Sequence, residues 1–276
     1  MAVTIIVVII VLIVLSKKNK VISPIDEIKN LKLTNRRYKN AAGQISILDD
    51  SHPAIIMFKE ILTKVENGDP NAAWAIGGFY ESGNITLDRD NLFPKNREKA
   101  LWWKIKAAEE GSSHAQFQLG QMYHFGLEDS LVKTNIKEAI KWYSRAVENG
   151  DFYALLALGE LYFYKYDNEI EIEIPQDYKK AFEYLSRAIE HKSTKQFGIS
   201  VTQYGLYNAA LKLGEMYASG SGVKQDLILA YKWFKIGGFD PDTHHKYPLK
   251  GKLSESDTKK ANELVEEWRK QHSNAL

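Results

Sequence analysis

Hydrophobic and polar positions divide the chain into three parts. Residues 2–15 are apolar except for Thr4, and residues 17–52 are mixed and largely polar. From Pro53 onward, apolar residues recur at the intervals expected for one face of an α-helix. The pattern predicts a folded helical body that begins near Pro53 and is preceded by an apolar segment and a polar linker.

The helical body contains two patterns that repeat together. Gly-x-x-Tyr starts at Gly77, Gly120, Gly159 and Gly214. Each copy is followed by an Ala, an aromatic residue three positions later and a small residue seven positions later, starting at Ala100, Ala139, Ala181 and Ala230. These spacings place each set on one helix face, so each repeat is predicted to be a pair of antiparallel helices. Self-similarity with a period of about 40 residues predicts a solenoid.

Turn residues agree with this division. Gly68-Asp, Gly111-Ser and Gly150-Asp follow the second helix of a predicted pair. A glycine favours the end of one helix, and Asp or Ser favours the start of the next. The sequence thus predicts a tight turn between successive pairs.

The repeated residues resemble the Sel1-like repeat family, relatives of the tetratricopeptide repeats. The fourth copy, residues 210–234, matches the family motif almost position by position, and the second copy keeps Gln118–Gly126 and Glu138–Tyr143. The resemblance implies an all-α fold, a right-handed α-solenoid of Sel1-like helix pairs, here with an N-terminal transmembrane helix. The predicted domains are an anchor at 1–16, a basic linker at 17–52 and a repeat domain at 53–273, with repeats near 68–110, 111–149, 150–191 and 205–238 and capping helices at 53–67 and 254–272.

The first three repeats depart from the family pattern, because each has a longer loop than the fourth between its motif tyrosine and the following alanine. Residues 165–174 alternate Glu and Ile, which is the period of a strand, and residues 191–203 interrupt the interval between the third and fourth repeats. Insertions of this kind map to one face of a solenoid and often form its binding face. Neutral variation in loop length is the alternative.

The apolar N-terminal segment is interpreted as an uncleaved membrane anchor. At about 1.5 Å per residue it falls short of the hydrocarbon core, so flanking lysines must snorkel. A cleaved signal peptide would need a basic start and a small-residue cleavage site, and neither is present. By the positive-inside rule, the body is placed in the cytoplasm rather than the periplasm. Lys17, Lys18, Lys20, Arg36 and Arg37 form a candidate lipid-facing cluster, or they only set this orientation.

Composition excludes several classes of protein. The chain has no cysteine, which excludes disulfide scaffolds, thiolate zinc sites and cysteine nucleophiles. It has 37 basic and 35 acidic residues, and the basic excess lies before Asn40. A mildly acidic body lacks the basic stripe that phosphate contacts require, so no nucleic-acid partner is expected.

No catalytic or metal-binding set is recognised. Asp240, Asp242, His244 and His245 crowd one segment but lack a metal-ligand spacing. Three Ser-x-x-Lys tetrads occur without the companion elements of serine-acylating enzymes. We therefore expect no catalytic residue, no metal and no cofactor.

These observations predict a non-catalytic, membrane-tethered repeat protein that binds a partner protein as an adaptor or an inhibitor. Its concave face is expected to be lined by first helices, and the candidate binding residues are Gln118, Gln121, His124, Glu160, Phe163, Lys212 and Glu215. One alternative is an immunity protein that neutralises a secreted antibacterial effector such as a lipase, which the resemblance to small anchored Sel1-like proteins implies. A hydrolase is the other alternative, although no nucleophile–base pair is recognised.

Overall fold

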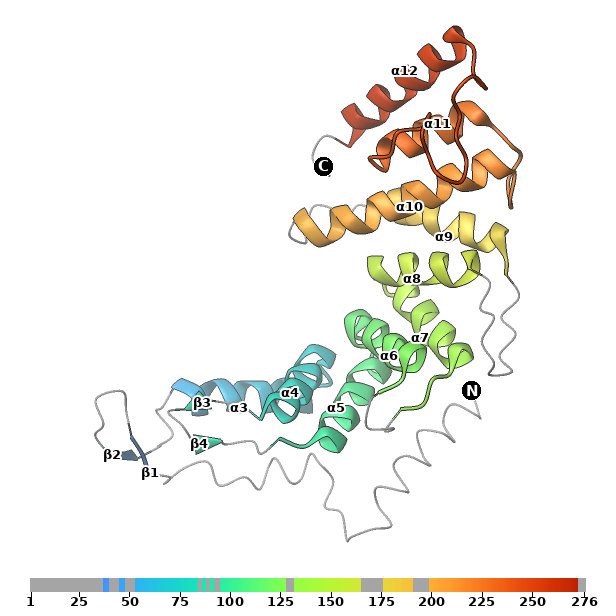
Figure 1. Ribbon diagram of the computed structural model, residues 1–276. Helices are drawn as coiled ribbons and strands as arrows, with labels where there is room; N and C mark the ends of the chain where they lie inside the picture. The colour runs from blue at the N-terminus through green and yellow to red at the C-terminus, as the bar shows by residue number, and fades with distance from the viewer. Residues whose placement is uncertain are drawn as a thin grey trace. The chain divides into compact units, whose positions relative to one another are not determined.

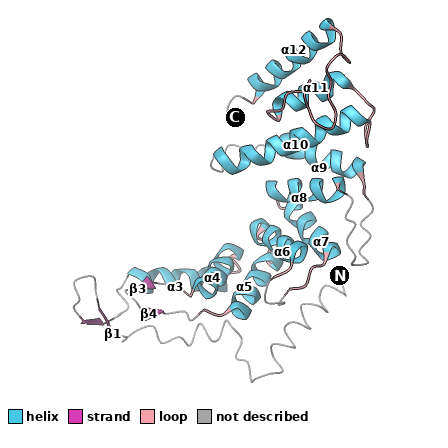
Figure 2. Ribbon diagram, in the orientation of Figure 1, coloured by secondary structure: helices cyan, strands magenta, loops and turns pink. Residues whose placement is uncertain are grey.

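The computed structural model describes residues 37–39, 45–47, 53–83, 86–87, 90–91, 95–127, 132–164, 176–190 and 199–272. The chain forms two compact units, residues 1–110 and residues 111–276. Helices account for most of the described residues in each unit (Figure 2). The predicted helical body is therefore confirmed.

The first unit contains one helix pair. Helix α3 (Pro53–Glu66) precedes α4 (Pro70–Ser82), which packs against α5 (Arg97–Glu109). Two short antiparallel hairpins complete the described part of this unit. Strand β1 (Arg37–Lys39) pairs with β2 (Ile45–Ile47), and β3 (Thr86–Leu87) pairs with β4 (Asp90–Asn91). The sequence analysis predicted none of these strands, which are only two or three residues long.

The second unit contains three helix pairs and a final helix. The pairs are α6 (Ser113–Phe125) with α7 (Ile136–Glu148), α8 (Phe152–Phe163) with α9 (Tyr178–Glu190), and α10 (Ile199–Ser219) with α11 (Leu227–Ile236). Helix α12 (Glu255–Gln271) packs on α11, and α8 also contacts α10. These helices follow one another in chain order along the unit (Figure 1). The second unit is thus an α-solenoid, and α10 begins inside the region predicted as an insertion.

Turn chemistry positions the helices as predicted. Gly68, Gly111 and Gly150 have positive φ angles of 77°, 102° and 82°, a conformation that suits glycine. In each case a nearby Asp or Ser then accepts a hydrogen bond from the first turn of the following helix. The capping oxygens belong to Asp69, Ser112 and Asp151.

The glycine of each Gly-x-x-Tyr motif marks a close approach between the two helices of a pair. A Cβ atom at Gly214 would lie 2.5 Å from Cδ1 of Phe234, whose ring is fully buried. The three equivalent contacts are Gly77 with Lys104, Gly120 with Tyr143, and Gly159 with Leu185. The contacting residue always stands one position after the aromatic residue of the second pattern. The sequence analysis identified the glycines but not these neighbours.

The tyrosine of each motif makes a second repeated contact, through its backbone. Its carbonyl oxygen accepts a hydrogen bond from the N–H of the residue that caps or precedes the second helix. The four bonds are Asn96 to Tyr80 at 2.8 Å, Asn135 to Tyr123 at 2.6 Å, Asp177 to Tyr162 at 3.0 Å and Asp226 to Tyr217 at 3.0 Å. Each bond fixes where the second helix begins relative to the first.

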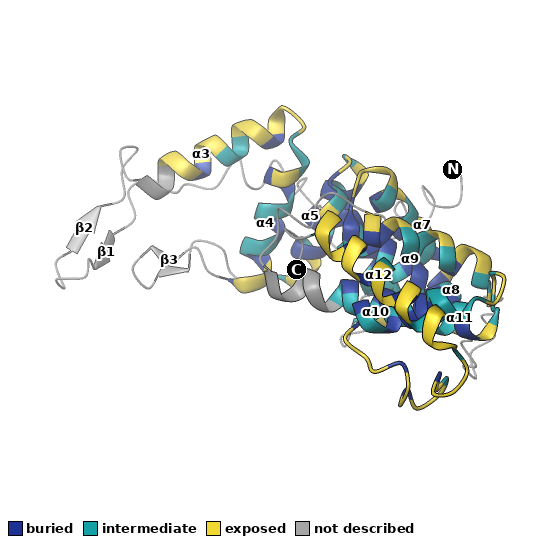
Figure 3. Cartoon of the chain, turned by 90° about the horizontal axis from the view of Figure 1, so that it is seen from above, coloured by how far each residue is buried: buried dark blue, intermediate teal, exposed yellow. Residues whose placement is uncertain are grey.

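The predicted single-pass membrane topology is corrected by the structure. None of the helices described is both long and apolar enough to cross a lipid bilayer. These helices interleave apolar and polar residues, because each buries one face against its neighbours. Figure 3 shows the exposed residues along one side of α12. The predicted anchor at 1–16 and the side chains of the basic cluster, Lys17, Lys18, Lys20, Arg36 and Arg37, lie outside what the structure describes.

An irregular segment between α11 and α12, residues 237–254, is held by a buried histidine. His244 is 4% exposed, and its ring stacks on Phe234 with a centroid separation of 4.3 Å. Its Nδ1 accepts a hydrogen bond from the backbone N–H of Tyr247 at 3.1 Å. The proton of the neutral ring therefore lies on Nε2, which is buried and has no hydrogen-bond partner. Protonation of Nδ1 would remove the acceptor that Tyr247 uses.

We predict that Gly214→Ala lowers the free energy of unfolding by about 1–3 kcal/mol, because its new methyl group meets the buried ring of Phe234. Gly78→Ala is the matched control, since Gly78 is also helical but nothing lies within 4 Å of the added Cβ. The control is expected to be neutral or to stabilise by up to about 1 kcal/mol. Thermal and urea unfolding followed by circular dichroism would measure both changes, and equal effects would contradict the prediction.

We predict that the protein loses stability as the pH falls through the range in which histidine titrates. Burial lowers the pKa of His244, the Glu215 carboxylate opposes this, and His245 and Lys246 lower the pKa further. Between the pKa of the folded state and about 6.5 in the unfolded state, the unfolded chain binds more protons, so stability falls with falling pH.

Urea unfolding at about pH 7.5 and about pH 5.5 would test this expectation, because few carboxylates titrate in that range. Burial also lowers the pKa of His124, with Glu160 opposing, so His124 contributes a loss of the same sign. His244→Gln is expected to reduce the pH dependence, while the exposed neighbour variant His245→Gln is expected to keep most of it. A pH dependence unchanged by His244→Gln would assign it to other groups.

Candidate functional site

The seven predicted binding residues all lie on first helices of pairs in the second unit. Gln118, Gln121 and His124 are on α6, Glu160 and Phe163 on α8, and Lys212 and Glu215 on α10. The structure brings Glu160, Phe163 and Lys212 together, and His124 lies near enough to Glu160 for that carboxylate to raise its pKa against the larger effect of burial. Gln118 and Gln121 are half-buried on α6.

A buried lysine forms the centre of this region. The Lys212 side chain is 4% exposed, and its Nζ lies 3.3 Å from Oε1 of Glu160. The same ammonium group donates to Oδ1 of Asn208 at 2.7 Å, and Nδ2 of Asn208 donates to Oε1 of Glu160 at 2.6 Å. Each of the three side chains thus contacts the other two. Because a buried cation requires compensation, this network fixes the position of Glu160 between α8 and α10.

Aromatic rings border the lysine on α8. Its Nζ lies 5.3 Å from the ring centroid of Tyr164 and 6.0 Å from that of Phe163. Phe163 is 7% exposed and belongs to the core, whereas Tyr164 is 49% exposed. The sequence analysis selected Phe163 and missed Tyr164, because helix periodicity does not show where the last turn of α8 ends.

A second exposed ring lies at the end of α6. Phe125 is 72% exposed and stacks on His124 with a centroid separation of 4.2 Å. His124 Nδ1 lies 3.4 Å from the hydroxyl oxygen of Tyr143 on α7. We call His124, Phe125, Glu160, Tyr164 and Asn208 the first-helix surface. It combines two exposed rings with a carboxylate and an amide held by a buried cation.

Glu215 takes part in a different contact. Its Oε2 lies 3.2 Å from Nζ of Lys246, which belongs to the segment between α11 and α12. The Glu215 side chain is 13% exposed, so it is mostly covered. This ion pair ties that segment to α10, which gives Glu215 a structural role in the folded chain.

The residues considered for metal binding do not form a metal site. Asp240 accepts hydrogen bonds from the backbone of Asp242 and the hydroxyl group of Thr243, and these bonds lower the pKa of its carboxyl group. His244 is buried, and its ring stacks on Phe234. Within the described helices and loops, no three His, Asp or Glu side chains gather as a metal site.

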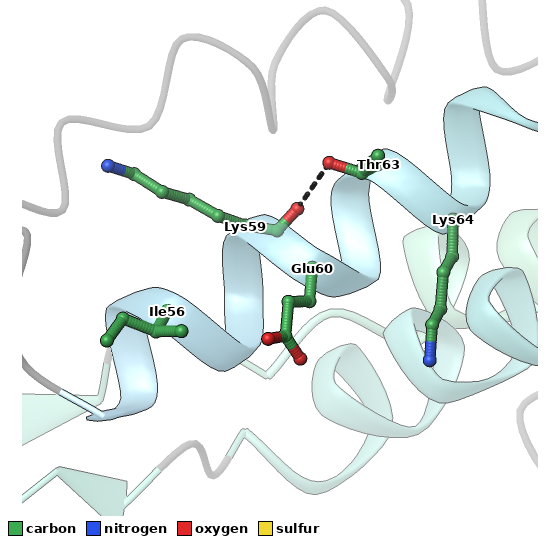
Figure 4. Close-up of a pocket in the computed structure, with 5 residues that line it drawn as sticks. All are labelled: Ile56, Lys59, Glu60, Thr63 and Lys64. Carbon is green, nitrogen blue, oxygen red and sulfur yellow. Dashed lines mark hydrogen bonds between the residues drawn. The ribbon is translucent and has the colours of Figure 1, made fainter.

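A shallow groove on α3 lacks the features of a ligand site. It has a volume of about 410 Å³ and is lined by Ile56, Lys59, Glu60, Thr63 and Lys64, all from one helix. Figure 4 shows Lys59 projecting away from the side on which Glu60 and Lys64 lie. The hydroxyl group of Thr63 donates to the backbone carbonyl of Lys59 at 2.9 Å. The polar groups of this groove therefore do not point toward a common centre.

Comparison with known proteins identifies the repeats. The family model described as Sel1 repeat matches residues 70–112, 113–151, 152–193 and 208–237. No curated protein matches the chain.

The crystal structures that are similar to the chain include those of two bacterial proteins. One is of a Sel1 repeat protein from Oxalobacter formigenes, with 29% identity and a TM-score of 0.48 over 65% of this chain and 62% of that one. The other is of a protective antigen present in uropathogenic Escherichia coli strains and displaying an SLR fold, with 25% identity and a TM-score of 0.38 over 76% of this chain and 47% of that one. The chain thus spans less than two thirds of the length of either.

We predict that the two ends of the buried ion pair differ in their effect on stability. Glu160→Gln should lower the free energy of unfolding by about 1–2 kcal/mol, because it leaves the Lys212 ammonium buried without its carboxylate. The expected loss is this small because the Glu160 side chain is 40% exposed and water screens its charge. Lys212→Met fills a similar volume and leaves a hydrated carboxylate, so its cost should stay below about 1 kcal/mol. Urea unfolding would measure both, and the reverse order would contradict this account.

Proposed function

This chain belongs to the Sel1 repeat family, and on that premise we propose that it binds a partner protein, without catalysing a reaction, through the first-helix surface of its second unit. Proteins built from Sel1 repeats are generally protein-interaction scaffolds. The proposal adds the location of the contact and the chemistry that a partner must match.

The observation that carries the proposal is the exposure of two rings on the first-helix surface, Tyr164 beside the buried Lys212 and Phe125 stacked on His124. Phe125 and Tyr164 are 72% and 49% exposed, and they are two of the five large hydrophobic residues that are exposed in the described part of the chain. Aromatic side chains are enriched among the residues that dominate binding energy, because they bury a large area at a small entropic cost. An exposed ring that contributes little to the core is well suited to contact another protein.

The polar groups support specificity at the same surface. Glu160 is 40% exposed, but its position is fixed by Asn208 and Lys212. A carboxylate that is already ordered loses little conformational freedom when it accepts a hydrogen bond from a partner. We therefore infer that the partner offers apolar side chains to the two rings and a hydrogen-bond donor to Glu160.

The two rings also stand next to the longer loops. Phe125 ends α6 and Tyr164 follows α8, and each directly precedes one of the connections that the sequence analysis found to be lengthened. A contact that combines a fixed helical surface with chain-specific loops suits an adaptor or an inhibitor of one partner. The immunity role is a special case of inhibition, and the identity of the captured partner distinguishes it from an adaptor role.

We predict that Phe125→Asp/Tyr164→Asp abolishes partner capture while leaving the fold intact. Affinity capture with the full chain, followed by mass spectrometry, would identify the partner, and titration of the purified partner would measure affinity. Loss of both rings should weaken binding at least about 100-fold, since truncating one dominant contact costs about 2 kcal/mol or more and the variant removes two. Met57→Asp is the matched control, because Met57 is 42% exposed but lies on α3 of the other unit.

Charge reversal at Glu160 or Glu215 would not be an interpretable test. Arginine at these positions would break the ion pairs with Lys212 and Lys246 and would disturb the fold itself.

Equal capture by the wild type and by the Phe125→Asp/Tyr164→Asp variant would assign the partner to another surface. Equal loss in the Met57→Asp control would show that the effect is not specific.

A further inference from the structure

A cavity at the C-terminal end of the second unit lies apart from the first-helix surface. It has a volume of about 430 Å³. Its lining residues belong to α9, α10, α11 and α12, together with His272, which directly follows α12. None of its lining residues belongs to the first-helix surface. Its volume falls within the range of about 300–1,000 Å³ that is typical of small-molecule sites.

Aromatic rings form much of the lining. Trp233 of α11 and Trp268 of α12 meet edge to face, with ring centroids 6.4 Å apart. Phe182 of α9 and Tyr217 of α10 also meet edge to face, at 5.6 Å. Trp233 is the aromatic residue of the fourth repeat pattern, and it is only half-buried, whereas its counterparts Trp103 and Trp142 are 0% and 2% exposed. The fourth repeat thus presents to the cavity a ring that the first two repeats bury completely.

A half-buried lysine supplies the charge of this cavity. The Nζ of Lys232 lies 4.7 Å from the centroid of Trp233. Burial lowers the pKa of Lys232, and the Glu267 carboxylate opposes this shift without forming an ion pair with the ammonium group. Across the described residues, no carboxylate forms an ion pair with Lys232. Glu190 also lines the cavity, but it is exposed, and water therefore screens its charge.

The position of Lys232 decides which ligands the aromatic lining can take. Aromatic rings alone would suit a cation, but Lys232 already places an ammonium group over Trp233 and would repel a second one. An anionic group would compensate this half-buried cation, and an apolar ring would cover the half-buried indole of Trp233. The other indole, Trp268, is 7% exposed and already stacks on His272. Ser186 and Gln271 add hydrogen-bonding groups to the lining.

We propose that this cavity is a binding site for a small aromatic carboxylate, whose carboxylate pairs with Lys232 and whose ring packs against the half-buried indole of Trp233. The site is distinct from the proposed protein contact, because none of its lining residues belongs to the first-helix surface. Either function can therefore fail without the other.

The test uses the full chain with N-acetyl-L-phenylalanine as the probe and its neutral amide as the matched comparison. Tryptophan fluorescence and NMR chemical shifts would follow both titrations. The carboxylate is expected to bind at least about tenfold more tightly than the amide, as a charge-assisted hydrogen bond in a partly dry site implies. In the wild type, the carboxylate should also raise the pKa of Lys232, because the opposite charge stabilises the ammonium form, and the amide should not.

Lys232→Met should remove the preference for the carboxylate while retaining the apolar stem. Lys235→Met, on the same helix but outside the cavity, should keep it. Far-UV circular dichroism and the unfolding midpoint of each variant would confirm that the fold is intact, and the pKa measurement in the wild type does not depend on any variant. Equal affinity for the two probes, a preference that survives in Lys232→Met, or no saturable change up to about 10 mM would each overturn the proposal.

Discussion

The contact between a first-helix glycine and a second-helix side chain is the constraint on which the rest of the structure depends. Because glycine has no side chain, the second helix of each pair can place a side chain against the backbone of the first. These side chains are Lys104, Tyr143, Leu185 and Phe234. Close packing of this kind fixes both the separation and the register of the two helices. Glu160 and Lys212 lie on α8 and α10, which Gly159 and Gly214 bring close to their partner helices, and Tyr164 directly follows α8.

The pairing of helices could be predicted from the sequence because it depends on local signals. Glycine and tyrosine recur at fixed spacing, and Asp or Ser follows the glycines that end second helices, so the helices and turns are encoded within a few residues of themselves. The apolar N-terminal segment is also a local signal, but the prediction drawn from it, a single-pass membrane topology, concerned the whole chain. The described helices do not support that topology.

The candidate site was less predictable because it depends on contacts between distant residues. Asn208 completes the network around Lys212, yet nothing near it in the sequence distinguishes it from an ordinary helical asparagine. Phe163 and Tyr164 are adjacent and chemically similar, and only the end of α8 decides that the first is buried and the second exposed. His244 lies among polar residues in the sequence, which gives no sign that its ring is buried and stacks on Phe234.

The hydrogen bond from the start of each second helix to the motif tyrosine carbonyl has a consequence for how such chains diversify. This hydrogen bond holds the two ends of the connecting segment together. The two helices can therefore keep their register while the sequence between those ends varies. The entropic cost of lengthening a closed loop grows only with the logarithm of its length, by about 0.6 kcal/mol for each doubling. The connections can therefore accept new sequence at little thermodynamic cost, which makes them natural positions for acquiring a new specificity or for grafting a foreign peptide.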